Sequence, residues 1–275
     1  MSWWSLHVTP GAAGRAELAR WLVDETGHAV EERDDGSLAA CMPSAGAVQD
    51  LAHRILQQFA LDASVAELDE VDWSIHWRDG IVPRHFGRLL LVPSWLSAAE
   101  SHAGPRIVLD PENAFGSGEH GSTRSALALL ERHLQPDSRV LDLGSGSGIL
   151  AIAAVVLGAQ RAIGIECDDE SNLVAQHNAG INKVADRTLF LTGDAALLAP
   201  VAGPAELVLS NILRTVNVTL LPAIRQALVP GGLAIFAGME EPEAPHFLSA
   251  LRETAFTVVD EVRDAGWWGV AARLQ

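Results

Sequence analysis

Apolar residues in the second half of the chain alternate between short continuous runs and longer stretches with helical spacing. The short runs predict buried strands, at 139–143, 161–166, 188–192, 206–210 and 233–237. The longer stretches predict helices, at 122–134, 149–157, 169–180, 214–228 and 243–253. Strands that alternate with helices across short connections are typical of a doubly wound parallel sheet.

Two further apolar runs end the chain, at 256–262 and 268–274. Only Arg263-Asp-Ala-Gly-Trp267 separates them, which is too short for the crossover that two parallel strands need. We therefore expect a hairpin, and one strand of an otherwise parallel seven-stranded sheet must be reversed.

The first 68 residues have the order βαββαβ, which is that of a small α+β ferredoxin-like domain. Strands are predicted at 4–8, 29–32, 37–42 and 64–68, and helices at 12–25 and 45–59. Asp34-Asp35-Gly36 is a hairpin turn signal between two of these strands. Residues 69–105, rich in tryptophan and with one strand at 88–92, are predicted to form a structured linker to a domain at 106–275.

Composition narrows the class of protein. With 275 residues, 48% of them hydrophobic, the chain can bury a sizeable core. Its longest apolar stretch, 149–159, is far shorter than the roughly 20 residues that span a bilayer, and the start Met1-Ser-Trp-Trp lacks the features of a secretory signal. Cys41 and Cys167 have no CxxC partner, so we expect no disulfide framework, no zinc site and a cytoplasmic location.

The net charge of the chain indicates which kind of binding partner it favours. Nineteen basic against 35 acidic residues give a formal net charge of −16, which repels a nucleic-acid backbone. An acidic surface suits a basic protein partner, although solubility alone explains it equally well.

The segment Asp142-Leu-Gly-Ser-Gly-Ser-Gly148 joins the first strand of the predicted sheet to its helix. Its glycines allow a tight turn that brings bare backbone N–H groups, at the positive end of a helix, against a ligand. A dinucleotide fingerprint is spaced G-x-G-x-x-G, whereas here the spacing is G-x-G-x-G after an acid. That pattern, and a sheet closed by one reversed strand, are typical of S-adenosylmethionine (SAM) methyltransferases.

Polar residues at the ends of the next three strands supply candidate ligand contacts, because ligands bind at the carboxyl ends of such strands. Glu166, 22 residues after Gly144, is placed to accept hydrogen bonds from ribose hydroxyls, or is a solvated acid at a strand end. Asp194 either accepts from an adenine amino group or only forms a turn. Asn211 carries an amide oxygen that can hold a substrate amine beside the methyl group.

Taken together, these motifs resemble the PrmA family, the methyltransferases of ribosomal protein L11. The resemblance is carried by Leu109-Asp-Pro, Ala114-Phe-Gly-Ser-Gly-Glu-His120, the run 141–154, Gly164-Ile-Glu166 and Ser210-Asn-Ile-Leu213, and by the connection segments 67–77 and 91–95. It implies a Rossmann-like seven-stranded class I methyltransferase domain, a substrate-recognition role for the first domain, and cofactor contacts from Thr123, Gly144, Glu166 and Asn211. The complete set of predicted cofactor-binding residues is Phe115, Thr123, Asp142, Gly144, Gly146, Glu166, Asp194 and Asn211.

Several positions depart from the family pattern. His120-Gly-Ser-Thr123 stands where the family has His-Pro-Thr-Thr, Glu166 stands where it has Asp, and 214–217 lack its Ala-Gly-Pro segment. The ending Gly266-Trp-Trp-Gly269 also differs. Cofactor binding should survive these changes, whereas the identity of the acceptor depends on residues 214–217.

The sequence thus predicts a SAM-dependent N-methyltransferase acting on amino groups of a protein, a basic ribosomal protein by resemblance, with Asn211 as the catalytic residue and no metal. His120 is either a proton acceptor or a residue that orders its loop. A dehydrogenase, a non-catalytic SAM-binding factor and a methyltransferase of another acceptor are the alternatives. The first domain either grips the protein substrate or only stabilises or dimerises the enzyme.

Overall fold

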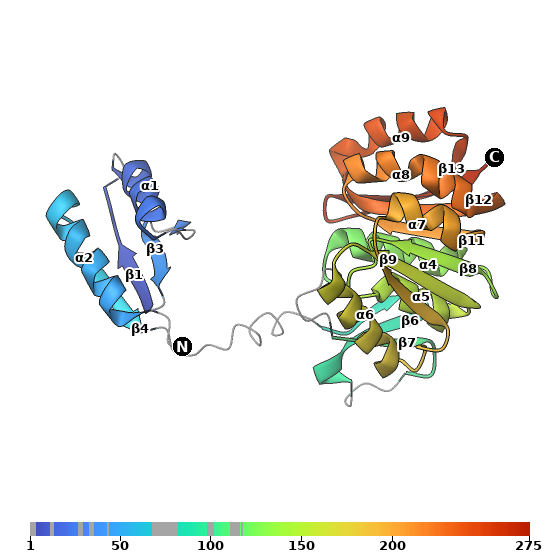
Figure 1. Ribbon diagram of the computed structural model, residues 1–275, viewed down its shortest axis with the longest axis horizontal. Coiled ribbons are helices and arrows are strands. Elements are labelled where there is room, and N and C mark those ends of the chain that lie inside the picture. Colours follow the sequence, from blue (N-terminus) through green and yellow to red (C-terminus); the bar gives the residue numbers. More distant parts are fainter. Residues whose placement is uncertain are drawn as a thin grey trace. The chain divides into compact units, whose positions relative to one another are not determined.

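The structure is a computed structural model that describes residues 4–11, 14–26, 30–32, 36–42, 44–67, 82–97, 102–110, 116 and 118–275. The chain divides into two compact units, Met1–Asp79 and Gly80–Gln275 (Figure 1). None of the helices within these described ranges is long and apolar enough to cross a membrane.

The first unit has the ferredoxin-like arrangement predicted from the sequence. Its elements are β1 (Trp4–Val8), α1 (Arg15–Thr26), β2 (Glu31–Glu32), β3 (Leu38–Met42), α2 (Ala45–Phe59) and β4 (Ala63–Glu67). The strands form one sheet in the order β2-β3-β1-β4, and β1 is antiparallel to both of its neighbours. Leu6 and Leu38 of the sheet pack with Leu22 of α1 and Ile55 of α2, and all four are fully buried. The unit therefore has a hydrophobic core of its own.

The second unit is built on a seven-stranded sheet in the order β10-β9-β8-β11-β12-β14-β13. The strands are β8 (Arg139–Leu143), β9 (Arg161–Glu166), β10 (Thr188–Thr192), β11 (Ala205–Asn211), β12 (Leu228–Glu240), β13 (Phe256–Asp264) and β14 (Trp267–Leu274). The pairs from β10 through to β12 are parallel, and β14 is antiparallel to both β12 and β13. The expected terminal hairpin is confirmed. Ala265 and Gly266 form its turn with φ of 49° and 82°, a conformation whose twist matches that of the strands it joins.

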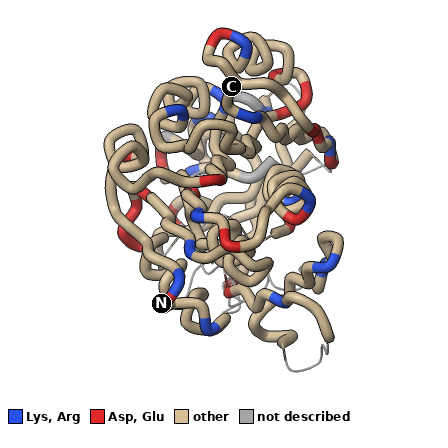
Figure 2. Tube along the Cα trace, turned by 90° about the vertical axis from the view of Figure 1, so that its right-hand side faces the viewer, with Lys and Arg blue, Asp and Glu red and all other residues tan. Residues whose placement is uncertain are grey.

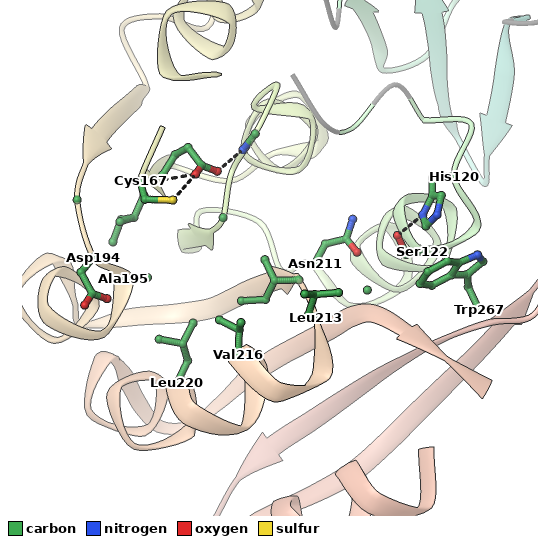
Figure 3. A pocket seen from close by; sticks show the side chains of 17 residues that line it. His120, Ser122, Cys167, Asp194, Ala195, Asn211, Leu213, Val216, Leu220 and Trp267 are labelled. Atoms are coloured by element: carbon green, nitrogen blue, oxygen red, sulfur yellow. Dashed lines mark hydrogen bonds between the residues drawn. The ribbon is translucent and has the colours of Figure 1, made fainter. Parts of the chain in front are cut away.

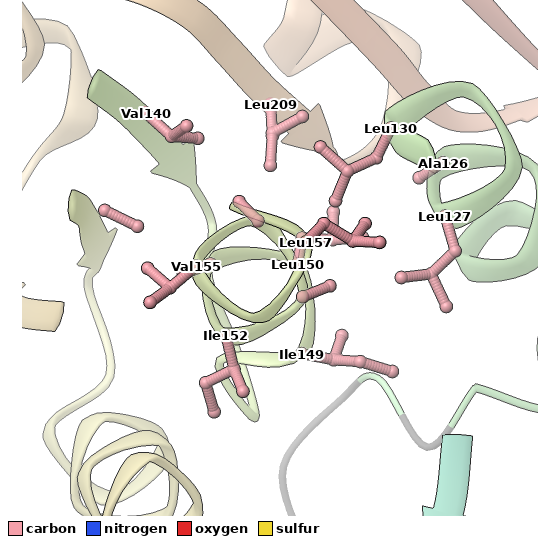
Figure 4. Close-up of a cluster of buried hydrophobic side chains, with 14 of the residues drawn as sticks. Ala126, Leu127, Leu130, Val140, Ile149, Leu150, Ile152, Val155, Leu157 and Leu209 are labelled. Atoms are coloured by element: carbon pink, nitrogen blue, oxygen red, sulfur yellow. The ribbon is translucent and has the colours of Figure 1, made fainter. Parts of the chain in front are cut away.

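Helices cover both faces of this sheet. They are α4 (Gly121–His133), α5 (Ile149–Leu157) and α6 (Asp169–Ile181) on one face, and α7 (Ala195–Ala202), α8 (Arg214–Ala227) and α9 (Ala244–Glu253) on the other. In Figure 4, α5 lies between α4 and the strands, with Leu127, Val140 and Leu209 packed around it. Because strand order reverses between β8 and β11, a crevice is expected at the carboxyl ends of these two strands.

The segment between the two predicted domains differs from the expectation. We predicted residues 69–105 as a structured linker with one strand at 88–92. That strand is present as β6 (Leu89–Pro93), but it pairs with β5 (Arg84–Phe86) and β7 (Arg106–Leu109) in a three-stranded sheet within the second unit. Leu89 and Ile107 are fully buried in the core that also contains α4 and α5. The amide of Asn182 on α6 pairs with both backbone groups of Val108, at 2.8 and 2.7 Å. Contacts with residues far along the chain, such as Asn182, stabilise this small sheet. The local pattern of apolar residues does not show such contacts.

Helix α7 was also missed. Its sequence, AALLAPVA, is apolar without helical periodicity and contains Pro200, so the pattern did not distinguish it from a loop. Asp194 begins the helix by accepting a hydrogen bond from the Ala196 N–H at 2.8 Å.

Basic and acidic residues are interspersed along the trace in Figure 2. Several arginines of the second unit are engaged by carboxylates: Arg139 by Glu206, and Arg214 by Glu243. These guanidinium groups are paired with carboxylates within the fold.

Candidate active site

A cavity of about 890 Å³ lies at the carboxyl ends of the central strands (Figure 3). The residues that line it lie at or just after the ends of β8, β9, β10 and β11, or belong to or adjoin α4, α7, α8, β12 and β14. They are His120, Ser122, Gly144, Gly146, Ile165, Glu166, Cys167, Gly193, Asp194, Ala195, Asn211, Ile212, Leu213, Val216, Leu220, Gly238 and Trp267. Figure 3 shows Cys167 and Asp194 at one end, His120 and Trp267 at the other, and Asn211 between them. Five of the predicted residues, Gly144, Gly146, Glu166, Asp194 and Asn211, therefore meet at one cavity.

Two glycines of the loop, Gly144 and Gly148, leave no room for a side chain. Gly144 has a φ of 70°, and a Cβ there would lie 2.5 Å from Cγ2 of Ile212. Gly148 has a φ of 79° at the start of α5, and its Cβ would lie 2.9 Å from that of Ala175. Both the backbone conformation and the close packing require glycine, so the loop brings its N–H groups to the cavity surface.

Glu166 ends β9 with its carboxylate held by backbone donors. Oε2 accepts from the Gly146 N–H at 3.1 Å, and Oε1 accepts from the N–H groups of Cys167 at 2.7 Å and Asp168 at 3.2 Å. A carboxylate oxygen has about two acceptor positions; both are occupied on Oε1, and Oε2 keeps one that can receive a ligand hydroxyl. The side chain is thus fixed at the cavity edge, as binding of a ribose requires.

Asn211 is the central polar group of the cavity. Its side chain is 9% exposed, and its Nδ2 donates to Oγ1 of Thr123 at 3.2 Å. Its Oδ1 is buried and has no hydrogen-bond partner among the described residues. An unpaired buried amide oxygen is unfavourable unless a ligand supplies a donor. Asn211 therefore presents an acceptor that fits an amine.

The loop that carries Asn211 is fixed from behind by Asn217 of α8. Asn217 is fully buried, accepts from the Ser210 hydroxyl at 2.7 Å, and donates to the carbonyls of Ile212 at 2.9 Å and Ala237 at 3.0 Å. The flanking residues of Asn211 are thus tied to α8 and to β12. This polar cluster was not predicted, since the sequence flagged 214–217 only as a departure from the family.

Two predicted cofactor residues, Thr123 and Asp142, are described but are not among the residues that line the cavity. Thr123 is fully buried and holds the Asn211 amide. Asp142 is 1% exposed, and its Oδ2 accepts from the Ala151 N–H at 3.0 Å, which ties β8 to the first turn of α5. Both side chains pack behind residues that line the cavity. In this structure they therefore help to hold the cavity residues in place. Phe115 lies outside the described residues.

The pKa of Asp142 is raised to about 7, chiefly by burial and to a smaller extent by the nearby Glu166 charge, while the hydrogen bond from Ala151 acts in the opposite direction. In the unfolded chain the pKa is near 3.9. Between about pH 4 and pH 7, Asp142 is ionised in the unfolded chain but still protonated in the folded protein. Ionisation therefore favours the unfolded state, and the free energy of unfolding falls progressively as pH rises through this range. We expect wild-type stability, measured by urea unfolding, to fall by about 2–3 kcal/mol between pH 5 and pH 7 relative to Asp142→Asn. Parallel curves for the two proteins would show that Asp142 is ionised throughout.

His120 lies at the start of α4, at the end of the cavity away from Asp194 (Figure 3). Its Nδ1 is 2.7 Å from Oγ of Ser122, and its ring centroid is 4.1 Å from that of Trp267. Burial and the positive charge of Arg124 lower the pKa of His120, so the imidazole is neutral at neutral pH. The contact with Ser122 fits the loop-ordering role, and the neutral ring fits a proton acceptor.

Among the cavity residues that had no role in the sequence prediction are Cys167, Gly238 and Trp267. Cys167 directly follows Glu166, and its Sγ lies 3.2 Å from Oε1 of that residue, so its position next to a predicted ligand was a usable signal. Gly238 has a φ of 81° within β12, and a Cβ there would lie 2.4 Å from the Ile212 carbonyl oxygen. A glycine inside a strand indicates such a close approach. Trp267 reaches the cavity only because the terminal hairpin folds back.

A mixed seven-stranded sheet with one reversed strand, and a cavity at its switch point lined by the glycine loop, Glu166 and Asn211, define a class I SAM-dependent methyltransferase. The chain belongs to the PrmA family: residues 23–275 match the family described as "Ribosomal protein L11 methyltransferase (PrmA)".

Individual relatives agree. A protein named ribosomal protein L11 methyltransferase from Pelotomaculum thermopropionicum is 35% identical over 268 residues, covering 96% of this chain and 86% of the relative. One of the same name from Thermus thermophilus is 37% identical over 205 residues, covering 73% and 77%. The crystal structure of a ribosomal protein L11 methylase from Lactobacillus delbrueckii subsp. bulgaricus matches with a TM-score of 0.63 at 32% identity, over 71% of this chain and all of that one.

Proposed function

We propose that this SAM-dependent protein methyltransferase transfers methyl groups to amino groups of ribosomal protein L11. The observation that carries the proposal is the buried, unpaired amide oxygen of Asn211, midway between the Glu166 end and the His120 end of one cavity. The names of the relatives at 35% and 37% identity support the choice of acceptor.

The residues of the cavity fit SAM, and each has a distinct task. Glu166 would accept from the ribose, Asp194 would accept from the adenine amino group, and the glycine loop would lie against the amino-acid portion. When bound, SAM supplies an electrophilic methyl group on a sulfonium. The role of the protein is to hold the nucleoside and leave the methyl side of the cavity open toward Asn211.

The chain's own contribution to the reaction is positioning and control of protonation. Asn211 Oδ1 would accept a hydrogen bond from the acceptor amine and so direct the nitrogen lone pair. The apolar side chains of Leu213, Val216 and Leu220 line the same cavity. Such surroundings disfavour an ammonium ion, and the neutral amine is the form that can react.

The direct test is to incubate the enzyme with purified ribosomal protein L11 and isotopically labelled SAM, and to locate the label by mass spectrometry. Label on an amino nitrogen is expected. L11 whose amino groups have been acetylated beforehand serves as the matched control and should take no label. Label on acetylated L11 would contradict amino transfer, and no label on intact L11 would refute the proposed acceptor.

Glu166→Ala is expected to weaken SAM binding about 10- to 100-fold, because hydrogen bonds to a charged acceptor contribute roughly 1.5–3 kcal/mol. Isothermal titration calorimetry measures the change in Kd. Glu170→Ala, in the exposed first turn of α6, is the control and should bind SAM as the wild type does. An unchanged Kd for Glu166→Ala would remove that residue from the ribose site.

A further inference from the structure

The end of the cavity remote from Cys167 and Asp194 is aromatic. His120 from α4 and Trp267 from β14 both line it, with ring centroids 4.1 Å apart and an angle of 56° between the ring planes. In Figure 3, Asn211 and Leu213 lie between this aromatic pair and the Asp194 end. If the Glu166 and Asp194 end holds the nucleoside, then the aromatic end faces the incoming acceptor, with the Asn211 amide between the two.

The position of Trp267 depends on the absence of a side chain at residue 121. A Cβ on Gly121 would lie 2.7 Å from Cδ1 of the indole and 2.6 Å from the carbonyl oxygen of Asp264. The hairpin turn at Ala265 and Gly266 brings Trp267 over the first turn of α4, where Gly121 leaves room for it. The indole is thus packed into place by the backbone.

Charged groups beside the pair are compensated. Arg124 holds the carboxylate of Asp264 with two hydrogen bonds, at 2.6 and 3.0 Å, and Arg84 holds that of Glu119 with its Nε at 2.9 Å and with its Nη2. Because the pKa of His120 is lowered by burial and by Arg124, the imidazole carries no charge that would repel a cation at neutral pH. The surface offered to the acceptor is therefore aromatic and close to neutral.

We propose that His120 and Trp267 form an acceptor subsite that binds the alkylammonium group of the incoming amine through cation–π contact, and that Trp267 is a specificity-determining residue. An alkylamine in water is protonated, with a pKa near 10.4, so the enzyme first meets its acceptor as a cation, which loses its proton to solvent or to the neutral imidazole of His120 before the nitrogen reacts beside Asn211. Aromatic faces attract such a cation, and tryptophan does so best. The inference rests on the proposed function, since it assumes that the acceptor is an amine.

The binding test uses n-butylammonium chloride and its neutral isostere 1-butanol, each titrated by NMR into the full chain saturated with S-adenosylhomocysteine. The wild type is expected to bind the cation about fivefold more tightly than the alcohol. Trp267→Leu should abolish that preference, and Trp267→Phe should keep part of it. Gly121→Ala, which displaces the indole, should reduce it. Val259→Ala, which trims an exposed apolar side chain on the same hairpin, should leave it intact.

Equal binding of the cation and the alcohol by the wild type would overturn the subsite, as would a preference that persists in Trp267→Leu. This readout needs no protein acceptor, so failure of L11 to become methylated would refute only the proposed substrate. Where L11 is methylated, Trp267→Leu should raise the KM for L11 about tenfold with an unchanged Kd for SAM. A KM equal to that of the wild type would also overturn the role of Trp267.

Discussion

Replacing Asn211 with alanine is expected to lower kcat about 100-fold while changing the Kd for SAM less than about threefold. Asn211 lines the cavity, and its amide oxygen is buried without a partner among the described residues, so we expect its contribution to arise when the acceptor amine is present. A misplaced nucleophile reduces methyl transfer by about two orders of magnitude. Initial rates at saturating SAM and acceptor, together with calorimetric titration of SAM, measure the two quantities.

Thr123→Val provides a matched comparison for Asn211→Ala. It removes the hydroxyl that accepts from Asn211 Nδ2 at 3.2 Å, retains the shape of a fully buried side chain, and leaves the amide itself in place. We expect an intermediate loss of kcat, about tenfold, because the amide is then held less firmly. If Asn211→Ala reduces SAM affinity as much as it reduces turnover, Asn211 is a cofactor ligand and not a residue that orients the acceptor.

The residues predicted correctly to meet at the cavity follow strands that a local pattern identifies. Gly144, Glu166 and Asn211 each end a continuous apolar run, and parallel strands bring their carboxyl ends to one edge of the sheet. Strand ends and glycine spacing are thus sufficient to bring these residues together. The same reasoning does not distinguish a residue that lines the cavity, such as Gly144, from one packed behind the lining, such as Asp142.

The features that escaped prediction depend on contacts between distant parts of the chain. Trp267 faces the cavity because β14 runs back beside β12 and places its first residue over Gly121, a relation between positions 146 residues apart. Asn217 is polar on an otherwise buried helix face because it pairs with the loop around Asn211. Strands β5 and β7, which were not predicted, pair with β6, the strand predicted at 88–92, against a surface that α4, α5 and α6 provide. None of these partners can be identified from the local alternation of polar and apolar residues.

Removing the first unit is expected to leave SAM binding intact and to reduce methylation of L11 at least about 100-fold in kcat/KM. The described residues that line the cavity all belong to the second unit, between His120 and Trp267. The first unit has its own sheet and its own core, and no strand of it belongs to the seven-stranded sheet of the second unit. We propose that it binds the protein acceptor, because binding energy from remote parts of a substrate is used to position the reacting group.

The measurement compares the full chain with a chain that begins at Gly80, the first residue of the second unit. Both should give the same Kd for SAM in calorimetry and the same rate with a high concentration of n-butylamine, which requires no recognition beyond the cavity. Only methylation of intact L11 should differ, and a loss of about 3 kcal/mol of remote binding energy corresponds to a factor of about 100. If the shortened chain methylates L11 at the full rate, the first unit only stabilises or dimerises the enzyme. If SAM affinity falls as well, the two units depend on each other for folding, and recognition must then be tested by substitutions on the surface of the first unit.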